Sequence, residues 1–284
     1  MKHLFFLPFI LLFSVMANGQ VFDTKSPLHR AFNDNPKWFS RITSNPDSFR
    51  VQIIYTQINR NKKNKPSFKE FSYRLNKEEY FYPASTVKMP IALLALEKIN
   101  ELGIKGLTRN SIMITDSAAA AQDHVYNQPN ANDGAPTIEN YIKQIFLVSD
   151  NDAFNRLYEF LGQEYIQRKL KEKGYPDVII RHRLQVNRTV EQQSITNPVK
   201  FYDTAGNLIY EQPAIKSNAV FEATNVLLGK GYMKSRKLIN EPFSFLNKNR
   251  IHLQDLHHIL QSVIFPEQFT RKKRFNLTED DYAF

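Results

Sequence analysis

An apolar stretch at residues 81–100, FYPASTVKMPIALLALEKIN, constrains the fold more than any other segment. Its apolar side chains are Val87, Ile91, Leu93, Leu94, Leu96 and Ile99. Because they leave little polar surface, the stretch predicts a helix that other elements cover on most sides. Yet the stretch carries Ser85 near its start, and Lys88 follows three residues later. A buried helix therefore begins with a hydroxyl and a cation.

This pairing has a chemical interpretation. Pro83 suits the first turn of a helix, where its missing N–H costs nothing. Ser85 then lies near the helix N-terminus, where unpaired backbone N–H groups favour negative charge. Residues three apart share a face, so we expect the Lys88 amine to reach the Ser85 hydroxyl. Burial lowers the pKa of a lysine, and a serine beside such a base is an activated nucleophile for acyl transfer.

A second motif supports this interpretation. Ser-x-x-Lys by itself arises about once by chance in a chain of this length, and a capping serine followed by a solvent-reaching lysine explains it equally well. The tripeptide Ser149-Asp150-Asn151 is rarer, although its residues also cap helices. We expect Ser149 to pass a proton from the lysine to a leaving nitrogen. The Asn151 amide is expected to hold a substrate carbonyl.

The order of the predicted elements indicates an α+β fold. β-branched and aromatic residues at 50–58 and 67–76 predict an antiparallel hairpin. Helical periodicity follows at 137–148 and after the SDN tripeptide, and a last clear helix covers 253–264. A small hairpin is predicted near 199–212. We therefore expect an antiparallel sheet with flanking helices and a mainly helical domain.

The N-terminal residues resemble an export signal. A basic start precedes a 13-residue apolar run at 4–16, and Ala17-Asn18-Gly19 supplies small residues for cleavage near Gln20. The run is too short to span a bilayer, and no later segment is long enough, so we expect no stable membrane anchor. The predicted organisation is a signal peptide at 1–19, the N-terminal part of an α/β subdomain at 20–80, and a mainly helical subdomain at 81–284. A chain with no cysteine has neither disulfides nor thiol metal sites, which fits a secreted or periplasmic bacterial protein.

The charge and the histidine content limit which partners and cofactors we expect for this protein. The net charge is +10, with basic clusters at 59–65, 167–173 and 271–274. No recognition helix or stacking motif lies among them, so they indicate solvated faces and no nucleic-acid partner. The seven histidines form no zinc pattern, since His257 and His258 face different ways on a helix. We expect no metal or organic cofactor and a monomeric protein.

The two motifs resemble those of the penicillin-recognising serine acyltransferases, above all class A β-lactamases, whose signatures are S-x-x-K, S-D-N and K-T-G. Residues 134–162, GAPTIENYIKQIFLVSDNDAFNRLYEFLG, follow the class A pattern from the Pro-Thr-Ile helix start to an asparagine four residues after SDN. The 85–97 segment also resembles class D enzymes, which lack SDN. The class A resemblance implies a role for each matching residue. These are the acylated nucleophile Ser85, its acid/base partner Lys88, the proton relay Ser149, the substrate-binding Asn151 and a structural Asn155.

Two further positions follow from the resemblance. Tyr126, in HVYNQPNA, resembles the tyrosine that walls the class A pocket, with an ordinary surface aromatic as the alternative. The class A deacylation base is a glutamate in an E-x-x-L-N context, and here that position falls near Arg188. Glu191 is the nearby carboxylate, and its alternative is an exposed loop glutamate. Without such a base the acyl-enzyme would persist, as in penicillin-binding proteins.

The third signature has no good match. Lys234-Ser235-Arg236 is the nearest imitation of K-T-G, and arginine cannot replace a glycine that lets backbone approach a ligand. Thr278 and Asp281 resemble a capping box opening a helix near the chain end. From these features we expect that the C-terminal strands of the fold, with the K-T-G motif, are missing.

The expected function is therefore a secreted serine hydrolase that opens β-lactams through an acyl-enzyme at Ser85. The alternatives are a DD-peptidase or penicillin-binding-like protein, or an impaired module that binds β-lactams or peptidoglycan peptides.

Overall fold

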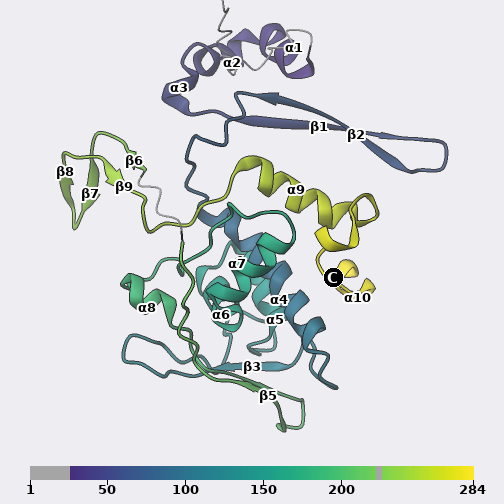
Figure 1. The fold of residues 1–284 in the computed structure, drawn as a ribbon, viewed down its shortest axis with the longest axis vertical. Coiled ribbons are helices and arrows are strands. Elements are labelled where there is room, and N and C mark those ends of the chain that lie inside the picture. The colour runs from purple at the N-terminus through teal and green to yellow at the C-terminus, as the bar shows by residue number, and fades with distance from the viewer. Residues whose placement is uncertain (1–25, 222–225) are drawn as a thin grey trace, which may run out of the picture. The chain divides into compact units, whose positions relative to one another are not determined.

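The computed structural model describes residues 26–221 and 226–284. The predicted signal peptide at 1–19 lies outside these residues. The chain forms two compact units that divide between Asn76 and Lys77 (Figure 1). Each unit is described by itself.

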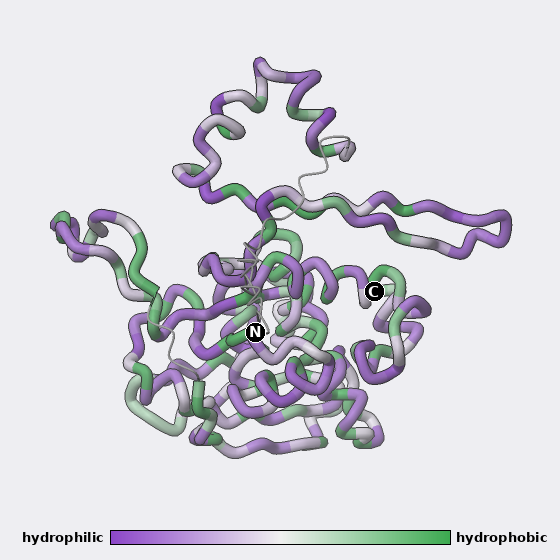
Figure 2. Tube along the Cα trace, turned by 45° about the horizontal axis from the view of Figure 1, so that its top comes forward, coloured by the Kyte–Doolittle hydropathy of each residue, from purple (hydrophilic) through white to green (hydrophobic). Residues whose placement is uncertain are grey.

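The described residues of the first unit, 26–76, form three short helices and a hairpin. The helices are α1 (Pro27–Asp34), α2 (Pro36–Thr43) and α3 (Pro46–Phe49). Each begins with proline, which suits a first helical turn. Strands β1 (Ile53–Arg60) and β2 (Pro66–Tyr73) pair antiparallel where the sequence predicts a hairpin, with Ile53 opposite Tyr73. The turn that joins these strands is hydrophilic (Figure 2).

The second unit is built around the predicted apolar helix. A 3-10 turn η1 (Ala84–Val87) leads directly into α4 (Lys88–Leu102). The helices α5 (Ile138–Val148), α6 (Asn151–Leu161) and α7 (Gln163–Glu172) pack against α4. The α4 side chains Ile91, Leu94 and Ala95 have essentially no exposed surface. α4 ends at Gly103, whose positive φ of 58° suits a glycine after a helix C-terminus.

A three-stranded antiparallel sheet completes this core. Its order is β3 (Ile112–Thr115), β4 (Val199–Tyr202) and β5 (Leu208–Gln212). Strands β4 and β5 form the predicted small hairpin. Strand β3 is not among the elements that the sequence predicts. Its Met113 and Thr115 are fully buried, so alternation over only four residues places it in the sheet.

The helix α9 and several shorter elements complete the described part of the unit. They are α8 (Val190–Ser194), β6 (Leu227–Leu228), β7 (Tyr232–Lys234), β8 (Lys237–Ile239), β9 (Phe243–Ser244), α9 (Leu253–Ile264), η2 (Pro266–Gln268), η3 (Arg271–Lys273) and α10 (Glu279–Ala283). β6 pairs with β9, and β7 pairs with β8. Ser235 and Arg236 have φ of 49° and 64°, so the Lys234-Ser235-Arg236 segment forms a tight hairpin turn. The predicted capping box of Thr278 and Asp281 is present at the start of α10.

The fold class is α+β, as the sequence predicts. Within the described ranges, no helix combines the length and apolar character needed to cross a membrane.

Candidate active site

The amine of Lys88 brings together four residues that the sequence singles out. Its Nζ lies 3.2 Å from the hydroxyl of Ser85 and 3.0 Å from that of Ser149. It lies 2.6 Å from both the backbone carbonyl of Ser149 and the side-chain oxygen of Asn151. An amine has at most three N–H groups, so these four oxygens share its protons. We call Ser85, Lys88, Ser149 and Asn151 the Lys88 group.

The residues of the Lys88 group lie at the starts of two helices, α4 and α6. Ser85 lies in η1, one turn before Lys88, and its side chain is exposed. The residue Lys88 is only 3% exposed, so an accessible hydroxyl meets a buried amine. The preceding Ala84 has a φ of 45°, in the left-handed region that non-glycine residues seldom adopt.

The SDN tripeptide connects α5 to α6. Ser149 has a φ of 55° and ends α5, and its N–H donates to the carbonyl of Ile145 at 3.1 Å. The carboxylate of Asp150 accepts the N–H of Ala153 at 2.8 Å and so caps α6. Asn151 is the first residue of α6. The tripeptide therefore caps helices and also turns two side-chain oxygens toward Lys88.

Burial lowers the pKa of the Lys88 amine, because desolvation disfavours its charged form. The Asp150 carboxylate opposes this effect and raises the pKa. The net direction is downward, which makes the neutral amine available at lower pH than for an exposed lysine.

Replacing Asp150 with asparagine should shift the pH dependence of acylation to lower pH. Asparagine keeps the helix cap but removes the negative charge that favours the ammonium form. The pKa of Lys88 then falls further, so the acylation rate begins to rise at a lower pH. The measurement is the rate of Ser85 adduct formation by intact-mass spectrometry between pH 5 and pH 10.

Asp152→Asn is the matched control, since Asp152 lies in the same turn and is exposed. In this control, the acylation rate should rise over the same pH range as in the wild type. An upward shift in Asp150→Asn would contradict the assignment of Lys88 as the base.

Gln185 extends the Lys88 group. The side-chain N–H of Asn151 donates to the Gln185 side-chain oxygen at 2.7 Å. Both ends of the Asn151 amide are thus engaged, one by Lys88 and one by Gln185. Gln185 has a φ of 57° and an exposed side chain. Sequence reasoning missed this residue, because no motif marks it.

The two other predicted site residues lie elsewhere. Glu191 is in α8, is exposed, and forms an ion pair with Lys216 at 3.1 Å. Tyr126 is 56% exposed, donates to Asp116 at 3.3 Å and stacks on His124. In the described parts of the chain, neither residue is hydrogen-bonded to the Lys88 group, so their roles stay predictions.

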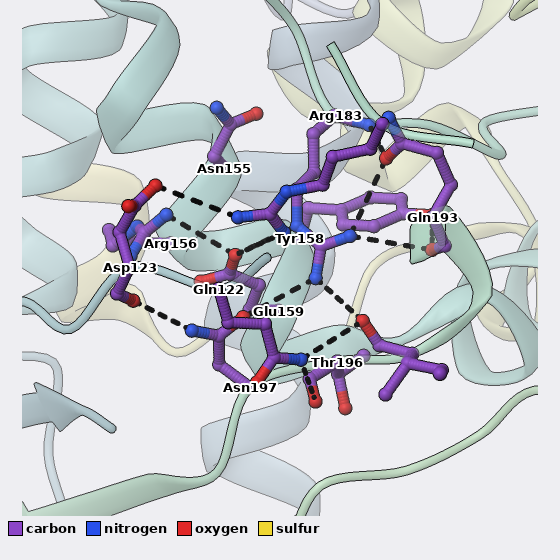
Figure 3. Close-up of polar contacts among 12 residues, drawn as sticks. Gln122, Asp123, Asn155, Arg156, Tyr158, Glu159, Arg183, Gln193, Thr196 and Asn197 are labelled. Atoms are coloured by element: carbon purple, nitrogen blue, oxygen red, sulfur yellow. Dashed lines mark hydrogen bonds and ion pairs between the residues drawn. The ribbon is translucent and has the colours of Figure 1, made fainter. Parts of the chain in front are cut away.

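A buried cluster of charges lies on α6 and the segment that follows α7 (Figure 3). The Glu159 carboxylate oxygen Oε1 lies 2.8 Å from Arg183 Nε and 3.2 Å from Arg156 Nη2. Arg188 contributes a third guanidinium, with Nη1 at 3.9 Å from the same oxygen. The Glu159 and Arg183 side chains are fully buried, and those of Arg156 and Arg188 are 2% and 4% exposed. We call these four residues the Glu159 cluster.

The Glu159 cluster anchors the segment that carries Gln185. Arg183 also donates to the carbonyl of Ile195 at 2.8 Å. Asn155 of α6 pairs with both backbone groups of Leu184, at 2.8 and 3.0 Å. Residues on both sides of Gln185 are therefore held to α6. The resemblance places a deacylation base near position 188, where this chain has Arg188, a member of the Glu159 cluster.

The comparisons identify the class of protein. The chain matches the family model Beta-lactamase2, described as the beta-lactamase enzyme family, over residues 44–275. This match spans most of the chain, which therefore belongs to the beta-lactamase enzyme family. A solved structure of L2 complexed with relebactam shows a weak likeness, with 11% sequence identity and a TM-score of 0.32. That likeness covers 55% of this chain and 79% of L2. No curated protein sequence matches the chain.

Proposed function

We propose that this protein is a secreted serine hydrolase of the class A type, in which β-lactams acylate Ser85. The observation that carries the proposal is the Lys88 group, with a buried amine between two hydroxyls and an amide oxygen. Burial lowers the pKa of that amine, so it can act as a base.

The proposed reaction follows from the order of these contacts. Neutral Lys88 takes the proton of Ser85 as the serine oxygen bonds to the lactam carbonyl carbon. The C–N bond of the ring then breaks. The proton on Lys88 passes through the Ser149 hydroxyl to the leaving nitrogen. The product is an ester on Ser85 and a ring-opened secondary amine, while Asn151 holds the amide of the acyl side chain.

Breakdown of this ester needs a water molecule and a base. The side chains joined at the Lys88 group carry an amine, hydroxyls and, through Gln185, amides. An amide holds water but takes no proton, so within this group the Lys88 amine is the one base that could serve both acylation and hydrolysis. Glu191 pairs with Lys216, so it would have to leave this ion pair and move in order to act as the base. This favours slow hydrolysis, which a DD-peptidase or penicillin-binding-like protein would also show.

A Ser85-dependent adduct should appear on incubation with benzylpenicillin. The expected mass increase equals one whole penicillin molecule, because ring opening loses no atoms. Intact-mass spectrometry over time measures it, and Ser85→Ala should show none. An equal adduct in Ser85→Ala, or none in the wild type, would contradict the proposed function.

The lifetime of the adduct distinguishes hydrolase from penicillin-binding behaviour. If Glu191 is the base, Glu191→Gln should lengthen the lifetime by roughly 10²–10⁴-fold. If the amide at position 185 limits hydrolysis, Gln185→Glu should shorten it and Glu191→Gln should have no effect.

Export is part of the same proposal, and Edman sequencing of the mature protein should begin near Gln20.

A further inference from the structure

A cavity of about 510 Å³ is lined by two residues that adjoin the Lys88 group, one in sequence and one by a hydrogen bond. Tyr82, three residues before Ser85, lines it, and so does Gln185, which contacts Asn151. The rest of the wall comes mainly from the segment that the Glu159 cluster anchors and from Lys248. Gln185 therefore belongs both to the cavity wall and to the hydrogen-bonded chain that includes Asn151.

The lining of the cavity is strongly basic. Arg181, Arg183, Arg188 and Lys248 contribute to it, and the lining residues in the described ranges include no aspartate or glutamate. Arg183 and Arg188 share the Glu159 carboxylate within the Glu159 cluster. Arg181 and Lys248 form no ion pair with any carboxylate that the structure describes. The cavity therefore has positive charge that its own described residues do not neutralise.

Two of these charges act on one residue of the cavity wall, His182. Burial lowers the pKa of His182, a hydrogen bond with the backbone of Arg183 raises it, and the charges of Lys248 and Arg181 lower it further. These two cations thus act at the same point of the cavity wall.

We propose that this cavity binds a carboxylate on the acyl side chain of the substrate. The inference rests on the proposed function, because Asn151 is the residue expected to hold the acyl side-chain amide. Arg181 and Lys248 supply the attraction, and Tyr82 contributes an aromatic ring to the cavity wall. Substrates with an anionic acyl side chain, whether β-lactams or wall peptides, are then favoured over neutral ones.

Benzylpenicillin and carbenicillin form a matched pair of probes, since carbenicillin adds one carboxylate to the acyl side chain. Binding of each is measured by titration calorimetry on the Ser85→Ala chain, which removes covalent chemistry. We expect carbenicillin to bind about tenfold more tightly or better, because hydrogen bonds to charged groups exceed neutral ones. Added salt should reduce this preference.

The variants locate the effect. Lys248→Met should reduce the preference several-fold, Lys248→Glu should abolish or reverse it, and Lys248→Arg should retain it. Lys171→Met, an exposed lysine on α7, is the control and should match the parent. Equal binding of the two probes, or a preference that survives Lys248→Glu, would overturn the inference.

Wild-type protein separates this inference from the proposed function. If neither penicillin forms an adduct, acylation at Ser85 is refuted. The ratio of the two dissociation constants measured by calorimetry still decides whether the cavity binds carboxylates. An adduct with both compounds at equal rates, together with equal affinities, would refute the carboxylate site and leave the nucleophile in place.

Discussion

Lys88→Met should slow acylation of Ser85 by about 10²–10⁴-fold, the usual contribution of a positioned general base. Methionine approximates the length of lysine but has no group that accepts a proton. The Ser85 hydroxyl then attacks without help, and Ser149 receives no proton to pass on. The measurement is the rate of adduct formation with benzylpenicillin, followed by intact mass.

Lys88→Arg separates the base from the cation. Arginine keeps the positive charge but stays protonated at all accessible pH values. It should therefore also lose most activity, and its rate should no longer rise with pH as the wild-type rate does. A Lys88→Met chain that acylates within about threefold of wild type would show that another group activates Ser85.

Glu159→Gln should lower the free energy of unfolding by about 3–5 kcal/mol, the usual cost of removing one partner from a buried ion pair. Glutamine preserves the shape of the side chain but leaves Arg156, Arg183 and Arg188 without their shared buried carboxylate. Their burial prevents water from compensating the loss. Urea unfolding followed by circular dichroism measures the change.

Glu191→Gln provides the stability control. Glu191 is exposed and pairs with the exposed Lys216, so its replacement should change stability by no more than about 0.5 kcal/mol. A loss below about 1 kcal/mol in Glu159→Gln would mean that the arginines find other partners. The loop carrying Gln185 would then not depend on the Glu159 cluster.

The longer elements of the fold are predictable because their signals are local. The helix α4 follows from its continuous apolar residues, and α6 follows from Phe154, Leu157, Tyr158 and Leu161 at helical spacing. The strands β6 and β9 were missed because two residues are too few for any periodicity. Their pairing encloses the β7–β8 hairpin, and no periodicity in either strand reveals it.

The same distinction applies to the site. The Ser85 and Lys88 contact follows from spacing along one turn, and the SDN motif identifies Ser149 and Asn151. Gln185 meets Asn151 only because the segment after α7 folds back over α6. Glu159 is an ordinary helical glutamate by sequence. Arg156 lies one helical turn before it, and tertiary packing adds Arg183 and Arg188 to make it the buried centre of three arginines.

The left-handed backbone at Ala84, Ser149 and Gln185 has a consequence for how such a site is maintained. Each of these residues has a side chain where glycine would be relaxed, at a cost of about 1–3 kcal/mol. At two of them the side chain supplies an atom of the hydrogen-bonded chain around Lys88. Substitutions selected only for thermal stability would thus tend to erode this site first, so a hardier protein obtained that way would be a poorer acyl acceptor.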